Sequence, residues 1–139
     1  MVLYQLGRFG AAVEAYEMSA SMSPGVSSTY NNLGISYMKA GRYDKAIRVF
    51  LEGLGYMPDN DLLLHNLGLS YQEKRDYQSA IDAIGRAYSL SPDKAAYANS
   101  LGLLYYYVED WEQALKVCAC ACVCVCACAC VCVRVCACV

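Results

Sequence analysis

Cysteine is absent from residues 1–117 of this 139-residue chain, although the whole chain has 10 cysteines. Without cysteine, no disulfide framework can hold this part together, so a reducing compartment such as the cytoplasm is expected. The chain also has only one histidine, His65, so a multi-histidine metal site lacks its ligands. A His-paired nucleophile would have to use this one imidazole, whose helical position suits a groove contact better. The sequence therefore predicts no metal site and no cofactor.

A strong charge of one sign is also missing, because 11 Lys and Arg stand against 13 Asp and Glu, for a net charge of -2. Lys39, Lys45 and Arg48 make a small basic cluster, but no long basic stripe follows it, so nucleic acid binding is not expected. The start of the chain lacks the basic flank and apolar core of a secretory signal. No phosphate-binding P-loop occurs, and no carboxylates pair for acid–base chemistry, so we expect no enzyme.

What the chain does have is a period of 34 residues in its first 117 residues. Columns of leucine, glycine and tyrosine agree at that spacing, followed by aromatic, alanine and proline columns. Self-similarity of this kind is typical of stacked repeats. The columns are Leu33, Leu67 and Leu101; Gly34, Gly68 and Gly102; Tyr37, Tyr71 and Tyr105; Phe9, Tyr43, Tyr77 and Trp111; Ala12, Ala46, Ala80 and Ala114; and Pro24, Pro58 and Pro92.

Each unit is predicted to form two antiparallel helices. In its first half, Tyr30, Leu33 and Tyr37 are spaced so that they share one face of a helix. The linkers at 40–42 and 74–76 have room only for a tight turn. Glycine inside a helix costs about 1 kcal/mol relative to alanine, so the glycine column is expected to allow close packing of the two helices.

These motifs resemble the tetratricopeptide repeat family, in NNLGISYMKAGRYDKAIRVFLEGLGYMPDN and again in HNLGLSYQEKRDYQSAIDAIGRAYSLSPD. The resemblance implies an all-α fold, an α-solenoid of antiparallel helix pairs wound into a right-handed superhelix. In such a solenoid the first helices line a concave surface and the second helices form the convex back.

The repeat register divides the chain into five parts. Residues 27–60 and 61–94 are complete repeats, residues 1–26 are a partial repeat with only a second helix, residues 95–117 are another partial repeat, and residues 118–139 are a low-complexity tail. A repeat array usually needs polar caps at its ends, and neither end of this pattern has one. We therefore expect a fragment of a longer protein of this family.

In the tail, every even position from 118 to 138 is Cys except Arg134, and the odd positions are Val or Ala. An alternating GT nucleotide tract encodes Val-Cys-Val-Cys, and single changes give Ala or Arg, so a translated nucleotide repeat is the favoured interpretation. A thiolate metal cluster, a membrane anchor within residues 117–133 and strand aggregation are the alternatives. The spacers lack turn residues and Arg134 ends the apolar run, which disfavours the first two.

The resemblance places ligand-facing positions on the first helix of each repeat. The predicted peptide-binding set combines amides, which both donate and accept hydrogen bonds, with apolar and aromatic side chains. Its members are Asn31, Asn32, Ile35, Met38, Lys39, His65, Asn66, Leu69, Gln72, Asn99, Leu103, Tyr106 and Tyr107.

Two roles stay open for the amides and for the tyrosines of this set. Asn32 and Asn66 resemble an asparagine ladder that holds a peptide backbone, although Ser100 interrupts the series; alternatively, such amides bond neighbouring helices. Tyr106 and Tyr107 either anchor a ligand or pack between repeats.

One column argues against a particular ligand. Family members that grip an acidic peptide terminus carry lysine where this chain has Asn31, His65 and Asn99. Binding of a chaperone tail is therefore not expected.

The favoured function is a protein–protein interaction module or scaffold, which binds a peptide or a partner helix in its concave groove and catalyses nothing. One alternative is the targeting arm of a larger enzyme, such as an O-linked glycosyltransferase. Another is a structural subunit of a ciliary, transport or cell-cycle assembly, and membership of a larger complex stays open. The identity of the partner is not readable, because a few surface side chains re-specify a groove.

Overall fold

The computed structural model describes residues 13–19, 22 and 25–122, with residues 118–122 described by their backbone. Residues 13–19 are helical, and six longer helices follow, while no strand occurs in this part of the chain. The predictions for Phe9, Ala12, Pro24 and residues 123–139 lie outside the described residues. The six helices are α2 (Ser27–Lys39), α3 (Tyr43–Tyr56), α4 (Asp61–Glu73), α5 (Tyr77–Leu90), α6 (Ala95–Tyr107) and α7 (Trp111–Cys122).

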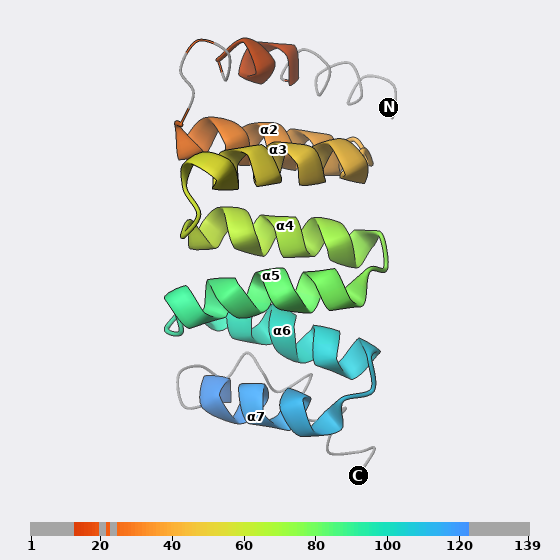
Figure 1. Cartoon of the computed structure of the whole chain (residues 1–139). Coiled ribbons are helices and arrows are strands. Elements are labelled where there is room, and N and C mark those ends of the chain that lie inside the picture. The colour runs from red at the N-terminus through yellow and green to blue at the C-terminus, as the bar shows by residue number, and fades with distance from the viewer. Residues whose placement is uncertain (1–12, 20–21, 23–24, 123–139) are drawn as a thin grey trace.

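The helices form three antiparallel pairs stacked in chain order (Figure 1). The first helices α2, α4 and α6 begin at Ser27, Asp61 and Ala95, so the 34-residue period of the sequence is also the period of the structure. Turns within a pair lie at one edge of the stack, and turns between pairs lie at the other (Figure 1). The predicted all-α solenoid of helix pairs is confirmed. Helix α7 continues past position 117, the predicted end of the last repeat, to Cys122.

The turn within each pair is a Schellman motif built at a fixed position of the repeat. Gly41, Arg75 and Glu109 all have left-handed backbones, with φ of 70°, 62° and 61°. In the first turn, the Gly41 N–H donates to the Met38 carbonyl and the Arg42 N–H to the Tyr37 carbonyl, and the other two turns repeat both bonds. Glycine adopts this conformation freely, whereas arginine and glutamate adopt it at a cost.

The turns between pairs follow from the proline column. The Asn60 N–H donates to the Met57 carbonyl at 3.2 Å, which closes a four-residue turn with Pro58 in its second position. The Lys94 N–H donates to the Ser91 carbonyl, also at 3.2 Å, and closes the equivalent turn around Pro92. Proline is favoured at the second position of a β-turn because its φ is already set.

The close packing expected at the glycine column is present in two pairs. A methyl group at Gly34 would lie 2.3 Å from ring carbons of Phe50, and one at Gly68 would lie 2.3 Å from Ile84 Cγ1. Such distances are far inside van der Waals contact, so the bulky side chain of the second helix occupies the place that a first-helix side chain would need. Phe50 and Ile84 are fully buried as a result.

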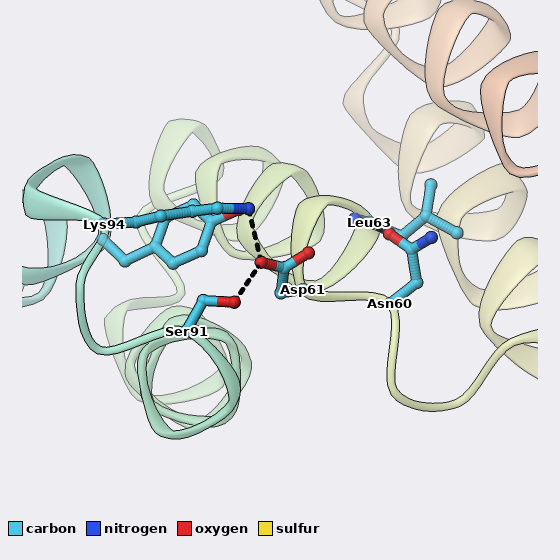
Figure 2. Close-up of polar contacts among 6 residues, drawn as sticks. Asn60, Asp61, Leu63, Ser91 and Lys94 are labelled. Atoms are coloured by element: carbon cyan, nitrogen blue, oxygen red, sulfur yellow. Dashed lines mark hydrogen bonds and ion pairs between the residues drawn. The ribbon is translucent and has the colours of Figure 1, made fainter.

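A polar network joins the second and third pairs at the edge where α4 begins (Figure 2). The Asp61 carboxylate accepts one hydrogen bond from Ser91 Oγ and another from Lys94 Nζ, each 2.6 Å long. These bonds lower the pKa of Asp61 from 3.8 to about 2, and the bond from Lys94 has the largest effect. Next to it, the Asn60 side chain caps α4 by accepting from the Leu63 N–H at 3.0 Å (Figure 2).

The left-handed turn position predicts that substitutions at two equivalent sites change the free energy of unfolding in opposite directions. Arg75→Gly is expected to raise the free energy of unfolding by about 1 kcal/mol, because it relieves a left-handed arginine, and Gly41→Ala is expected to lower it by about 1 kcal/mol. Gly85→Ala is the matched control, since the added methyl meets open space within helix α5. Because alanine favours a helix, this control is expected to stabilise. Urea denaturation under reducing conditions measures all three, and equal effects of the two alanine substitutions would contradict the assignment.

The Asp61 network predicts a pH-dependent contribution to stability. The folded pKa is lower than the ordinary value, so the contribution is complete above pH 3.8 and is lost as the pH falls towards 2. At neutral pH, Asp61→Asn is expected to lower the free energy of unfolding by about 1 kcal/mol, and the gap to the wild type should close in acid. Asp59→Asn, on the exposed turn beside it, should change little at either pH. A deficit of Asp61→Asn that persists unchanged in acid would refute this role.

Candidate peptide-binding face

The predicted ligand-facing residues lie on α2, α4 and α6, and we refer to the surface that they form as the first-helix face. Exposure varies along it. Asn32, Lys39, Asn99 and Tyr107 are exposed; Asn31, Ile35, Met38, His65, Leu69, Gln72, Leu103 and Tyr106 are half-buried; and Asn66 is buried.

A pair of amides joins α2 to α4. Asn66 Nδ2 donates to Asn31 Oδ1 at 2.6 Å, and only 8% of the Asn66 surface is exposed. A buried amide of this kind would destabilise the fold if its partner were removed. Of the two roles considered for the asparagines, a bond between neighbouring helices is therefore the one that Asn31 and Asn66 have in this structure.

His65 joins α4 to α6 in the same way. Its Nε2 lies 3.1 Å from Ser100 Oγ, and its ring lies against the Tyr97 ring with a centroid distance of 4.6 Å. Burial lowers the pKa of His65, Asp61 raises it in part and Lys94 lowers it further. The imidazole is therefore neutral at pH 7 and serves as a link between helices.

These two links share one spacing, which the 34-residue alignment of the repeats does not reveal. In each, a side chain bonds one that lies 35 residues further along the chain, on the next first helix. The two partners therefore come from adjacent columns of the repeat. Pairing each residue of the first column with the residue 35 positions later gives Asn31 with Asn66 and His65 with Ser100. The Ser100 hydroxyl therefore takes the place in the second link that the Asn66 amide has in the first.

Between the polar links, the face presents a column of apolar side chains. Ile35 packs partly against the buried cluster that contains Leu33 and Phe50, and Leu69 packs partly against the cluster of Ile81 and Ile84. Leu103 occupies the equivalent place on α6 and is also half-buried. Each first helix therefore leaves part of a branched apolar side chain accessible to a ligand.

Gln72 is an unusual member of the face. Its Oε1 is buried and accepts no hydrogen bond among the residues that the structure describes. An unsatisfied buried acceptor costs about 1–3 kcal/mol. The equivalent positions of the neighbouring repeats, Met38 and Tyr106, carry largely apolar side chains, so the column itself does not require an amide at this place.

Tyr106 and Tyr107 belong to a cluster of four aromatic rings. Tyr107 stacks on Tyr77 with centroids 5.3 Å apart, and Tyr106 packs edge-on against Trp111 at 5.4 Å. The two tyrosines also contact each other. Tyr107 therefore packs against α5 and Tyr106 against α7, and Tyr107 remains 47% exposed.

Other kinds of site are not found in the described part of the chain. No three His, Cys, Asp or Glu side chains of residues 13–19, 22 and 25–117 come together in a way that would hold a metal ion. None of the described helices combines the length and the hydropathy that crossing a bilayer requires. The cysteines behind the metal-cluster alternative and nearly all of the uncharged run behind the anchor alternative lie in residues 118–139, whose side chains the structure does not describe.

Solved structures similar to this chain share its stacked helix pairs. Two crystal structures of MamA superpose with TM-scores of 0.76 and 0.75 at 26% identity, and each covers 83% of this chain. A structure of MamA from residue 41 to its end, from Desulfovibrio magneticus RS-1, has a TM-score of 0.72 at 23% identity over 83% of this chain, and supports the fold alone. This chain covers 63–67% of the length of these three solved chains.

Sequence comparison gives the family. A profile of the tetratricopeptide repeat matches residues 25–93, and a second profile of the same repeat matches residues 65–122. Among curated protein sequences, no match is found. Because the two profiles together cover all six labelled helices, and because the fold agrees, the chain belongs to the tetratricopeptide repeat family.

Proposed function

We propose that the first-helix face binds a segment of a partner protein, either an extended peptide or one helix, and that the chain performs no chemistry of its own. Tetratricopeptide repeats generally mediate contacts between proteins, which supports an interaction role in broad terms. The observation that carries the finer proposal is the column of half-exposed Ile35, Leu69 and Leu103 on three helices whose spacing is held by polar links.

The polar links matter because they prepare the face before a ligand arrives. The Asn31–Asn66 and His65–Ser100 bonds fix neighbouring first helices relative to each other, so little ordering remains to be done on binding. Completing the burial of each aliphatic side chain contributes about 1 kcal/mol. Three such contacts on a prearranged surface suit a ligand with apolar side chains at regular intervals.

The polar residues of the face narrow the chemistry of the ligand. Asn32 and Asn99 are exposed, and their amides can both donate to and accept from a peptide backbone. Lys39 is the only cation among the predicted binding residues. We infer that an amphipathic or neutral segment binds here, and that an acidic terminus does not.

Selection from a displayed peptide library tests this proposal with the full chain under reducing conditions. Peptides recovered on the wild type are expected to bind Leu69→Gln and Tyr107→Ser at least about tenfold more weakly, because each substitution removes apolar contact area from the face. The matched controls are Leu90→Gln and Tyr56→Ser, whose side chains are 45% and 54% exposed on α5 and α3. Both controls should bind as the wild type does.

Circular dichroism of every variant separates loss of binding from loss of fold. The proposal fails if the folded wild type selects no peptide. It also fails if the selected peptides lose affinity with the control variants while tolerating Leu69→Gln and Tyr107→Ser.

A further inference from the structure

A group of cations lies outside the first-helix face, at the edge where the turns within the pairs lie. Arg42, Lys45 and Arg48 come from the first of these turns and from the start of α3, while Lys74 and Arg75 come from the second turn. All five are exposed, and Figure 1 shows the two turns on the same side of the stack. We call these five residues the basic edge.

The carboxylates within this region are already engaged. Asp44 binds Lys74 at 2.5 Å, Glu73 accepts from the Tyr43 hydroxyl at 3.5 Å, and the Asp76 side chain caps α5 by accepting from the Ser79 N–H at 3.3 Å. Asp44 is neutralised by Lys74, whereas Glu73 and Asp76 bond neutral donors and keep their charge. Five cations against these three carboxylates therefore leave the edge with a net charge of +2.

Few of the cations of the basic edge have a charged partner within the fold. Among the described residues, the ion pairs use only Lys74 from this set. Lys45 Nζ lies 5.5 Å from the centre of the Tyr37 ring, a contact that leaves its three N–H donors able to bind an anion. Arg42, Lys45, Arg48 and Arg75 therefore keep charge and donors for an external partner.

The two turns also enclose a concave surface. A cavity of about 460 Å³ is lined by Gly41, Arg42, Tyr43, Asp44, Lys45 and Lys74. Since Lys74 comes from the turn that follows, the cavity spans neighbouring repeats. Its size accommodates a side-chain carboxylate together with part of the backbone that carries it.

The positive surface is short, which limits the partners that it suits. The third turn at the same edge carries Glu109 and Asp110, and Glu112 follows at the start of α7, where Lys116 binds it at 2.7 Å. Long nucleic acids bind best to an extended basic stripe, which the acidic third turn interrupts. A run of a few carboxylates has the length and charge that match two basic turns.

We propose that the basic edge binds an acidic segment, rich in Asp and Glu, of a partner protein. The cavity between the two turns receives at least one carboxylate, and Arg42 and Lys45 supply charge-assisted hydrogen bonds to it. This surface differs from the first-helix face, so one partner can occupy each, or one long partner can contact both.

Fluorescence anisotropy with a labelled peptide of alternating Glu and Asp tests the proposal on the full chain. The wild type is expected to bind this peptide and to bind it more weakly as salt is added. The double variant Arg42→Glu/Lys45→Glu should weaken binding at least about tenfold. The double variant Arg86→Glu/Lys116→Glu makes the same change in net charge outside the five residues of the basic edge, on α5 and α7, and should weaken binding less than about threefold.

Three further probes separate the possible outcomes. A peptide with Gln and Asn in place of the acids should not bind, Leu69→Gln should bind the acidic peptide normally, and a single-stranded oligonucleotide of equal charge should bind more weakly than the peptide. Equal losses in the two double variants, preference for the oligonucleotide, or no binding by a natively folded chain at low salt would each overturn the proposal. A failure of peptide selection on the first-helix face would leave this result unaffected.

Discussion

The stack depends on the absence of a side chain at one position of each first helix. Since Gly34 has no Cβ, the ring of Phe50 fits against the backbone of α2, and Ile84 uses Gly68 in the same way. The second helices of the first two pairs are therefore fixed at short distance, and their buried side chains then form the surfaces on which the next pairs pack. Fully buried Ala46 and Ala80 add small contacts to the same approach.

This packing accounts for the two separate surfaces of the molecule. Once the pairs stack at a regular interval, neighbouring positions of successive first helices come within reach, and the Asn66–Asn31 and His65–Ser100 bonds form between adjacent columns of the repeat. The turns within the pairs meet at one edge for the same reason, which brings Lys74 beside Asp44. A repeat thus converts one local geometry into a long face and a charged edge.

The repeat period made the fold predictable, because the helices, their short linkers and the close glycine contact all follow from spacing. The hydrogen-bond partners of individual side chains could not be predicted from this spacing. The pairing of Asn31 with Asn66 depends on how far one first helix is displaced against the next, and the sequence left that open. Likewise, the left-handed backbone at Arg75 and Glu109 was hidden, because only Gly41 carries the residue type that signals it. Lys45 and Arg48 of the basic edge already stood out as a basic cluster in the sequence, but Lys74 and Arg75 joined them only when the fold brought two turns together.

A thermodynamic double-mutant cycle between Gly34 and Phe50 tests the central constraint most directly. The methyl of Gly34→Ala meets ring carbons Cε1 and Cζ of Phe50, which leucine lacks. We expect Gly34→Ala to be strongly destabilising in the wild type and far less so in the Phe50→Leu background, with a coupling energy of at least about 1 kcal/mol in urea denaturation. Additive effects of the two substitutions would contradict it.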